Sequence, residues 1–151
     1  MRVAPRAGFV AVLFLLCFAV PTSHAAPGAA PKLMVNDINK ARRAHGVAPL
    51  RQSSSLRRTS MRYAGFMLHS GYFGHLARIR ASGRFRRLGE IIAFHSDSRL
   101  RIRETVRRWL KSPPHRAAML SRRFRLAGAG TRNGRFRGRR SRTWVVQFGS
   151  R

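Results

Sequence analysis

The sequence predicts one domain of the α+β class, with helices through most of the chain and an antiparallel strand pair at its end. Its 151 residues allow one domain with its own core, because domains commonly contain about 100 to 200 residues. Apolar residues recur at helical spacing in several segments, as Met34, Ile38 and Ala41 illustrate. The strand pair is predicted over 124–132 and 143–149, where short apolar runs flank a basic segment.

Four helices are expected in the part of the chain that precedes this strand pair. They lie over 33–45, from serines 53–55 to about Gly71, from a cap at Asp97 or Ser98 to Pro113, and over 114–120. Gly46 ends the first helix, which follows an Ala, Pro and Gly-rich linker over 26–32. Ser112 is expected to cap the fourth helix, since proline is favoured at the first helical position.

The remaining segments are predicted as loops and one short strand. The stretch 72–88 has no clear period and is expected to be a long loop that carries His75. The apolar run 90–94 suits a strand or another buried segment. Asn133-Gly134 is a turn signal, but eight residues separate it from the last strand, so we expect a wide loop rather than a tight hairpin.

The first 25 residues have the features of a secretory signal peptide. Arg2 and Arg6 make a basic start, 9–20 is an apolar run, and Ser23-His24-Ala25 suits cleavage after Ala25. The run has 12 residues, fewer than the roughly 20 that a membrane-spanning helix needs. We therefore expect a secreted, extracellular protein that does not span the membrane. The only cysteine, Cys17, lies in this segment, so the mature chain is expected to have no disulfide and no thiol chemistry.

Charge is the most extreme feature of the composition. The chain has 32 basic and 4 acidic residues, a net charge of +28, and removal of the signal peptide would leave about +26. Nearly all the basic residues are arginine, which pairs bidentately with phosphate and carboxylate. The excess of arginine has two possible origins: a functional surface or the codon bias of a GC-rich genome. Either way, salt-sensitive binding to anionic polymers is expected, without specific reading of nucleic acid, since Phe136 is the only aromatic in the basic segment.

Short motifs occur in a fixed order along the chain. They are Asn39-Lys40-Ala41-Arg42, Gly46-Val47-Ala48-Pro49-Leu50, 64–67, Phe73-Gly74-His75, Gly89-Glu90-Ile91-Ile92-Ala93, Trp109-Leu110-Lys111-Ser112-Pro113-Pro114-His115-Arg116, Gly128-Ala129-Gly130 and 144–149. In this order they resemble the bacterial branch of the CAP superfamily, which comprises cysteine-rich secretory, antigen 5 and pathogenesis-related class 1 proteins and is also called the SCP domain. The resemblance implies a CAP domain over 33–151, folded as a three-layer α/β/α sandwich with a central, mainly antiparallel sheet.

The resemblance also implies a cleft that holds histidines and acidic residues. Its members here are His75, Glu90 and His115, and His75 and His115 are the expected metal ligands. Two imidazoles and a carboxylate suit zinc. Family members often have Asn where Ile91 stands, and the second acidic position has only Lys111 or Ser112. We therefore expect weak zinc binding at most, and no required cofactor.

The other histidines, acidic residues and tryptophans, and Ser112, are expected to have structural roles. His45, His69 and His95 match no family position and are expected to be ordinary surface or loop residues. Glu104 is expected to pair with neighbouring arginines, whereas Asp37 and Asp97 suit helix starts. Trp109 and Trp144 are expected in the core. Ser112 precedes His115 by three residues, but capping is its expected role because no nucleophile motif is present.

Three functions compete. The leading hypothesis is a secreted, non-enzymatic module that binds a ligand, such as a lipid, a sterol or a cell-surface molecule, in the cleft or on the basic surface. The second is a metal-dependent hydrolase that uses His75, Glu90 and His115. The third is a binder of anionic polymers, which include nucleic acid, wall polymer and lipid headgroups.

Overall fold

The computed structural model describes residues 28–81 and 83–151, so the expected signal peptide and its cleavage site after Ala25 lie outside the described residues. The helices are α1 (Ala29–Ala44), α2 (Ser54–Ser70), α3 (Ile102–Lys111) and α4 (Pro113–Leu120). The strands are β1 (Arg51–Gln52), β2 (Arg87–His95), β3 (Leu126–Phe136) and β4 (Arg139–Ser150). Within the described ranges, none of the helices has the length and apolar content needed to cross a membrane.

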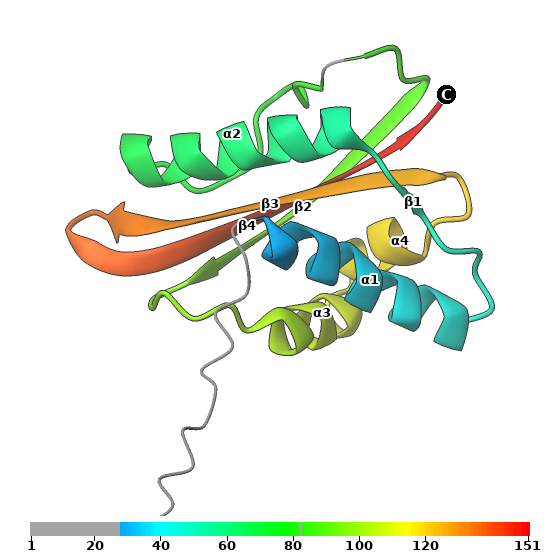
Figure 1. Ribbon diagram of the computed structural model, residues 1–151, viewed down its shortest axis with the longest axis horizontal. Helices are drawn as coiled ribbons and strands as arrows, with labels where there is room; N and C mark the ends of the chain where they lie inside the picture. The colour runs from blue at the N-terminus through cyan, green and yellow to red at the C-terminus, as the bar shows by residue number, and fades with distance from the viewer. Residues whose placement is uncertain (1–27, 82) are drawn as a thin grey trace, which may run out of the picture.

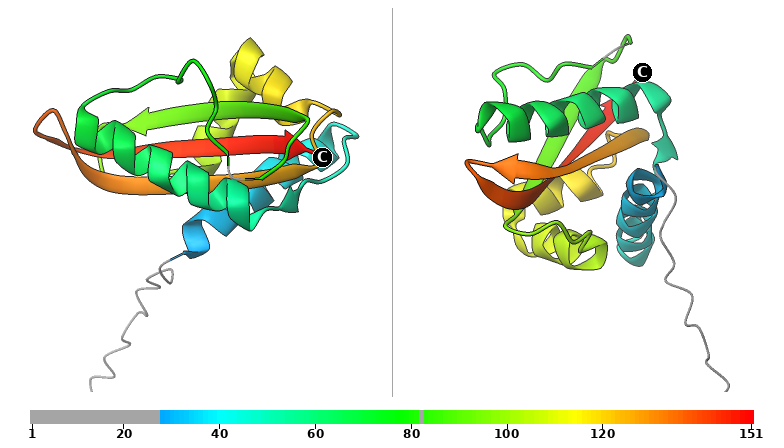
Figure 2. Two further views of the ribbon diagram at one scale, coloured as in Figure 1. Left: turned by 90° about the horizontal axis from the view of Figure 1, so that it is seen from above. Right: turned by 60° about the vertical axis from the view of Figure 1, so that its left-hand side comes forward.

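These elements form three layers around one sheet (Figure 1). The strand order is β1, β3, β4, β2, with β1 parallel to β3 and the other two pairings antiparallel. Helix α2 covers one face of the sheet, and α1, α3 and α4 cover the other (Figure 2). The predicted α+β sandwich with a mainly antiparallel sheet is confirmed.

The last strand supplies the centre of the core. Trp144, Val146 and Phe148 alternate along β4 and are fully buried in the layer that faces α1 and α3, where Trp109 joins them. Val145 points to the opposite face and packs against the apolar side of α2. Both tryptophans therefore lie in the core, as predicted.

Helix α2 lies unusually close to β3 because two glycines face it. A methyl group added to Gly128 would lie 2.1 Å from the backbone nitrogen of Arg57, and one added to Gly130 would lie 2.2 Å from that of Met61. Ser60 uses this proximity to donate a hydrogen bond from its hydroxyl to the carbonyl of Gly128, at 2.9 Å. The Gly-Ala-Gly sequence of β3 thus fixes the depth at which α2 sits on the sheet.

The prediction of a wide loop between the last two strands is wrong. Asn133 and Gly134 stay within β3 and are paired with β4, and the strands are joined by Arg137 and Gly138 alone. Both joining residues have positive φ, 48° and 82°, as a two-residue hairpin requires to match the twist of its strands. Arg137 is held there by a hydrogen bond from Nε to the carbonyl of Gly71.

Two helix starts also differ from the prediction. Helix α1 begins at Ala29, so residues 29–32, expected in the linker 26–32, are helical; Pro31 is compatible with this because it lies in the first turn. Helix α3 begins at Ile102 rather than directly after Asp97 or Ser98. Asp97 instead accepts hydrogen bonds from the backbone nitrogen of Arg99 and from the side chain of Arg101, which closes a turn before the helix.

Candidate functional site

Glu90 lies at the centre of the candidate site. It stands on β2 directly opposite Gln147 of β4, and its side chain is only 3% exposed. The Nδ1 atom of His75 donates to one carboxylate oxygen at 3.0 Å, and Nε2 of Gln147 donates to the other at 3.0 Å. Since an ionised carboxylate only accepts hydrogen bonds, it sets the tautomer of His75 and the orientation of the Gln147 amide. Both oxygens of the buried acid are therefore satisfied.

The polar chain continues from Gln147 into α2. The amide oxygen of Gln147 accepts a hydrogen bond from the hydroxyl of Thr59, at 2.5 Å, and both side chains are buried. A line of side chains thus runs from the exposed imidazole of His75 through Glu90 and Gln147 to the helix. Neither Gln147 nor Thr59 was predicted as a site residue. The one available signal was that Gln147 is the only amide in the apolar run of the last strand.

His115 lies in the first turn of α4 and faces the same region as His75. Its Nδ1 atom is 2.7 Å from the hydroxyl of Ser112, and its ring lies over Trp109 with 6.5 Å between ring centroids. Burial lowers the pKa of His115 below the usual 6.5, and the nearby charge of His75 lowers it further. Ser112 occupies the N-cap position, as expected, but its hydroxyl binds His115 instead of a backbone N–H. Its expected capping hydrogen bond is therefore absent.

The three expected cleft residues do not make a ready metal centre. Among the described residues, no group of three or more histidine, aspartate or glutamate side chains is placed to hold a metal ion. The Nδ1 atoms of His75 and His115 are engaged by Glu90 and Ser112, and both oxygens of Glu90 are hydrogen-bonded. Engagement of Nδ1 leaves Nε2 as the ring atom of each histidine that could bind zinc, and zinc binding remains a prediction from the resemblance.

A cavity of about 410 Å³ opens beside Glu90, between α2 and the segment that follows it. Its apolar walls are Tyr63, Phe66, Leu76 and Ile79. Its polar lining consists of Arg62, Arg80, Thr59, Glu90 and Gln147. Hydrogen bonds link the side chains of Thr59, Gln147 and Glu90, so this part of the polar lining is held in place by the protein itself.

Tyr63 holds the loop that closes this cavity. Its hydroxyl donates to the carbonyl of Gly74 at 2.5 Å, so α2 is tied to the loop one residue before His75. Burial, followed by the charge of Glu90, raises the pKa of Tyr63 to about 12. The phenol therefore stays protonated and remains a hydrogen-bond donor at physiological pH.

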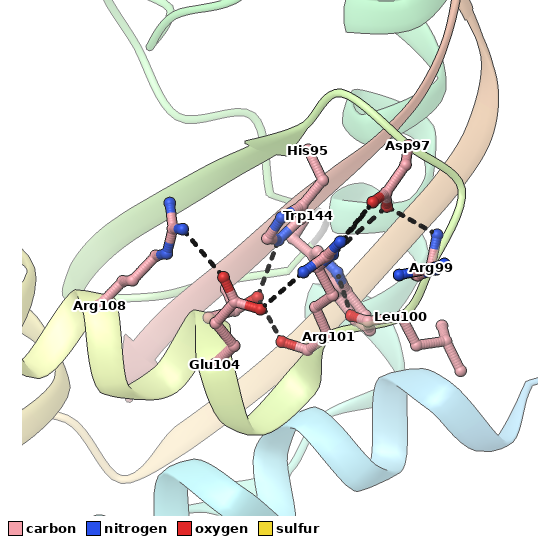
Figure 3. A network of polar contacts seen from close by, with 9 residues as sticks. His95, Asp97, Arg99, Leu100, Arg101, Glu104, Arg108 and Trp144 are labelled. Atoms are coloured by element: carbon pink, nitrogen blue, oxygen red, sulfur yellow. Dashed lines mark hydrogen bonds and ion pairs between the residues drawn. The ribbon is translucent and has the colours of Figure 1, made fainter.

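A second polar network lies at the far end of β2 (Figure 3). His95, expected to be an ordinary surface or loop residue, is only 8% exposed and places Nε2 2.9 Å from the hydroxyl of Thr105. The prediction is wrong because β2 ends directly over α3. Arg101 bridges Asp97 at 2.6 Å and Glu104 at 3.0 Å. Glu104 also pairs with Arg108, so the ion pairing predicted for Glu104 is present.

Of the remaining predictions on charged side chains, those on the histidines are confirmed and the one on Asp37 is wrong. His45 and His69 are exposed, as expected. Asp37 does not start a helix, because α1 begins eight residues earlier; it lies in the middle of α1 and pairs with Lys40 at 3.0 Å. Every acidic residue of the chain therefore has a partner, whereas most arginines have no ion pair among the described residues.

Comparison with known proteins agrees with this architecture. Residues 35–148 match the family described as CAP, the cysteine-rich secretory protein family. Comparison with curated proteins finds no match.

Several solved structures share the fold. An outer surface protein of Borrelia burgdorferi is 20% identical with a TM-score of 0.63, over 80% of this chain and 91% of that one. An extracellular SCP-domain protein of Bacillus anthracis is 17% identical with a TM-score of 0.62, over 82% of this chain but 41% of its own. Venom allergen-like protein 4 of Schistosoma mansoni is 13% identical with a TM-score of 0.64, over 82% and 89% of the two chains.

Proposed function

The chain belongs to the cysteine-rich secretory protein (CAP) family, and on that premise we propose that it is an exported, non-enzymatic module that binds a small amphipathic ligand. The ligand lies in the cavity beside Glu90, with its apolar part against α2 and an anionic end toward Arg62 and Arg80. The observation that carries this proposal is the combination of apolar walls and two arginines in one cavity.

The size and lining of the cavity support a small ligand. Its volume of about 410 Å³ lies within the roughly 300 to 1,000 Å³ that small-molecule sites occupy. Tyr63, Phe66, Leu76 and Ile79 supply apolar contact, and the arginines supply charge complementary to a carboxylate or phosphate. A long-chain fatty acid has both features and is the probe of choice.

The geometry favours binding over catalysis. A general base must be reached by its substrate, but the side chain of Glu90 is only 3% exposed and each of its oxygens already accepts a hydrogen bond from a protein group. His115 is oriented by Ser112 and has no carboxylate among its hydrogen-bond partners in the described chain. Glu90 therefore serves to hold His75 and Gln147 in place.

Calorimetric titration with palmitate tests the binding proposal. The variant Leu76→Glu, which places a charge in the apolar wall, should abolish binding. Arg80→Gln should weaken palmitate binding about 3-fold, as for one exposed ion pair, and should leave binding of the neutral alcohol of the same length unchanged. Arg78→Gln is the matched control, since Arg78 is an exposed neighbour that does not line the cavity. Equal palmitate affinity in wild type and Leu76→Glu would refute the site.

Export is proposed from the first 25 residues and from the extracellular or surface location that the names of two solved relatives state. Mass spectrometry of culture medium should find a chain that begins at Ala26. Recovery of the intact chain from the membrane fraction alone would contradict export.

A further inference from the structure

Three aromatic rings form a row outside the core, at one end of the molecule. The Phe73 and Phe94 ring centroids are 5.6 Å apart, and those of Phe94 and Phe136 are 5.0 Å apart. These residues come from the segment after α2, from β2 and from β3. Phe73 is 39% exposed and its neighbour Tyr72 is 43% exposed, so the row presents apolar surface to solvent. Contiguous apolar surface of this kind commonly marks an interaction site.

The β3–β4 hairpin is fixed against this row. Arg137 lies over the ring of Phe136, 5.4 Å from its centroid, and donates a hydrogen bond to the carbonyl of Gly71 at 3.2 Å. Arg135 donates to the carbonyl of Gly138 across the turn. Figures 1 and 2 show the tip of the hairpin and the C-terminal end of α2 at the same end of the molecule. The aromatic row and the hairpin therefore form one preformed surface.

This surface is strongly cationic. Exposed arginines crowd the hairpin tip at positions Arg135, Arg137, Arg139 and Arg140. None of the ion pairs among the described residues involves them, because the four acidic side chains are engaged elsewhere with Lys40, His75, Arg101 and Arg108. We call this surface the aromatic–arginine edge and define it as the four arginines with Tyr72, Phe73, Phe94 and Phe136.

We propose that the aromatic–arginine edge docks the protein on anionic phospholipid bilayers. The arginines pair with lipid phosphates, and the exposed aromatics enter the interfacial region, where such rings are favoured. A soluble polyanion would use the arginines but would gain little from Phe73. The exposed aromatics therefore favour a lipid surface over duplex nucleic acid or a wall polymer, neither of which offers an unpaired base to stack on Phe73. Docking is peripheral, and it uses a surface distinct from the cavity beside Glu90.

Sedimentation with vesicles tests the proposal on the exported chain, which is expected to begin at Ala26. Vesicles of phosphatidylcholine with one quarter phosphatidylglycerol should bind it at 150 mM salt, whereas pure phosphatidylcholine should not. A basic residue near an anionic leaflet contributes roughly fivefold to partitioning, so R135Q/R139Q/R140Q should weaken binding by about 100-fold. Arg137 is left in place because it ties the hairpin to the end of α2 through the carbonyl of Gly71, whereas the hydrogen bond of Arg135 stays within the hairpin. The charge-matched control is R103Q/R107Q/R116Q on α3 and α4, which should weaken binding less than tenfold.

The aromatic part of the edge needs its own variants. Phe73→Ser should weaken vesicle binding severalfold and leave retention on heparin unchanged. Phe73→Trp should bind as the wild type does, and its emission should shift to the blue on anionic vesicles, while the native tryptophans are already buried. Thermal melting verifies that each variant is folded.

Three outcomes would overturn the proposal. The first is equal loss of binding in the two triple variants, which would show that only net charge matters. The second is a Phe73→Ser variant that binds vesicles as the wild type does or loses heparin retention equally, which would show a polyanion site. The third is equal binding to neutral vesicles. Palmitate titration is independent of all three, so failure of docking and failure of the cavity proposal are separable.

Discussion

Arg42 is a buried cation without a carboxylate partner among the described residues. Its guanidinium is fully buried and donates to the carbonyl of Ala48 at 2.8 Å, of Met119 at 2.7 Å and of Ser121 at 3.1 Å. Burial, with a smaller effect from Arg125, lowers its pKa. One side chain thus joins the end of α1, the turn after it and the end of α4. Its motif neighbour Asn39 makes two hydrogen bonds to the backbone of Leu50.

Replacing Arg42 by alanine should cost about 3 kcal/mol in the free energy of unfolding or more, because buried carbonyls lose their donors and a cavity is left. Urea unfolding followed by circular dichroism measures this. The neighbouring Arg43→Ala is the control and should change stability by less than about 0.5 kcal/mol, since Arg43 is exposed. Similar stabilities in the two variants would show that the Arg42 hydrogen bonds are not required.

His95 gives the fold a dependence on pH. Burial lowers its pKa, and this outweighs the opposing charges of Glu104 and Asp97. The unfolded chain therefore binds a proton before the folded one does, so stability is lost as pH falls below about 6.5 toward the lower folded pKa. Above pH 7 the residue is neutral in both states and has no such effect.

The loss of unfolding free energy between pH 7.5 and 5.5 should therefore be smaller in His95→Gln than in the wild type. All other titratable groups are common to the two proteins, so comparison of the two pH profiles isolates His95. Parallel profiles would show that His95 is not buried as a neutral ring.

At the residue scale, the family resemblance named side chains that lie near one another but did not predict their contacts. The motifs placed His75, Glu90 and His115 in one region, and the structure puts His75 and Glu90 3.0 Å apart. Gln147 and Thr59 were not predicted because their roles depend on strand register and on how deeply α2 packs on the sheet. The burial of His95 depends in the same way on where α3 packs, which no local pattern reveals.

At the element scale, the contact between α2 and β3 depends on the absence of side chains on one strand face. Gly128 and Gly130 face the helix, and any Cβ there would overlap its backbone. The helix also carries Thr59 and Tyr63, so its depth on the sheet sets the hydrogen bond to Gln147 and one wall of the cavity. The two glycines therefore act on the site through the position of α2.

Gly130→Ala should destabilise the fold by about 2 kcal/mol or more, because the new methyl group would lie 2.2 Å from a backbone nitrogen that cannot move alone. It should also weaken ligand binding in the cavity. Gly134→Ala on the same strand is the control, since its methyl group would meet only Leu68 at 3.5 Å. Thermal melting of both variants decides the matter, and an unchanged melting temperature for Gly130→Ala would contradict the packing argument.

The helices were largely predictable because apolar spacing reports which face is buried. Helix α2 ends at Ser70 and is followed by Gly71, close to the predicted end. The hairpin was not predictable in the same way. Asn-Gly is a strong local signal, but pairing of β3 with β4 through Asn133 outweighed it, and the turn formed where Gly138 supplies a positive φ. Tertiary pairing thus outweighed the stronger local turn signal.

At the scale of the whole molecule, net charge is the dominant property. The net charge is +28 for the full chain and would be about +26 without the first 25 residues. The four acidic residues are engaged in one buried cluster and in ion pairs on α1 and at the start of α3, so they do not offset the arginines of α2 or of the hairpin. The sequence predicted this excess but not its distribution, because the distribution depends on how the elements pack.

Such a molecule should bind duplex DNA in a manner governed by salt and not by base sequence. Each phosphate neutralised contributes a slope of about −0.9 in log affinity against log salt, so contact with about six phosphates would cost roughly 10³-fold in affinity between 50 and 200 mM salt. Fluorescence anisotropy with two duplexes of unrelated sequence should give superimposable curves at each salt concentration. Phe73→Ser should follow the same curves, because the exposed aromatic has no base to stack on in a duplex. Binding that is insensitive to salt, or a tenfold preference for one duplex, would mean that the arginines form a specific nucleic-acid site and that net charge alone does not explain the binding.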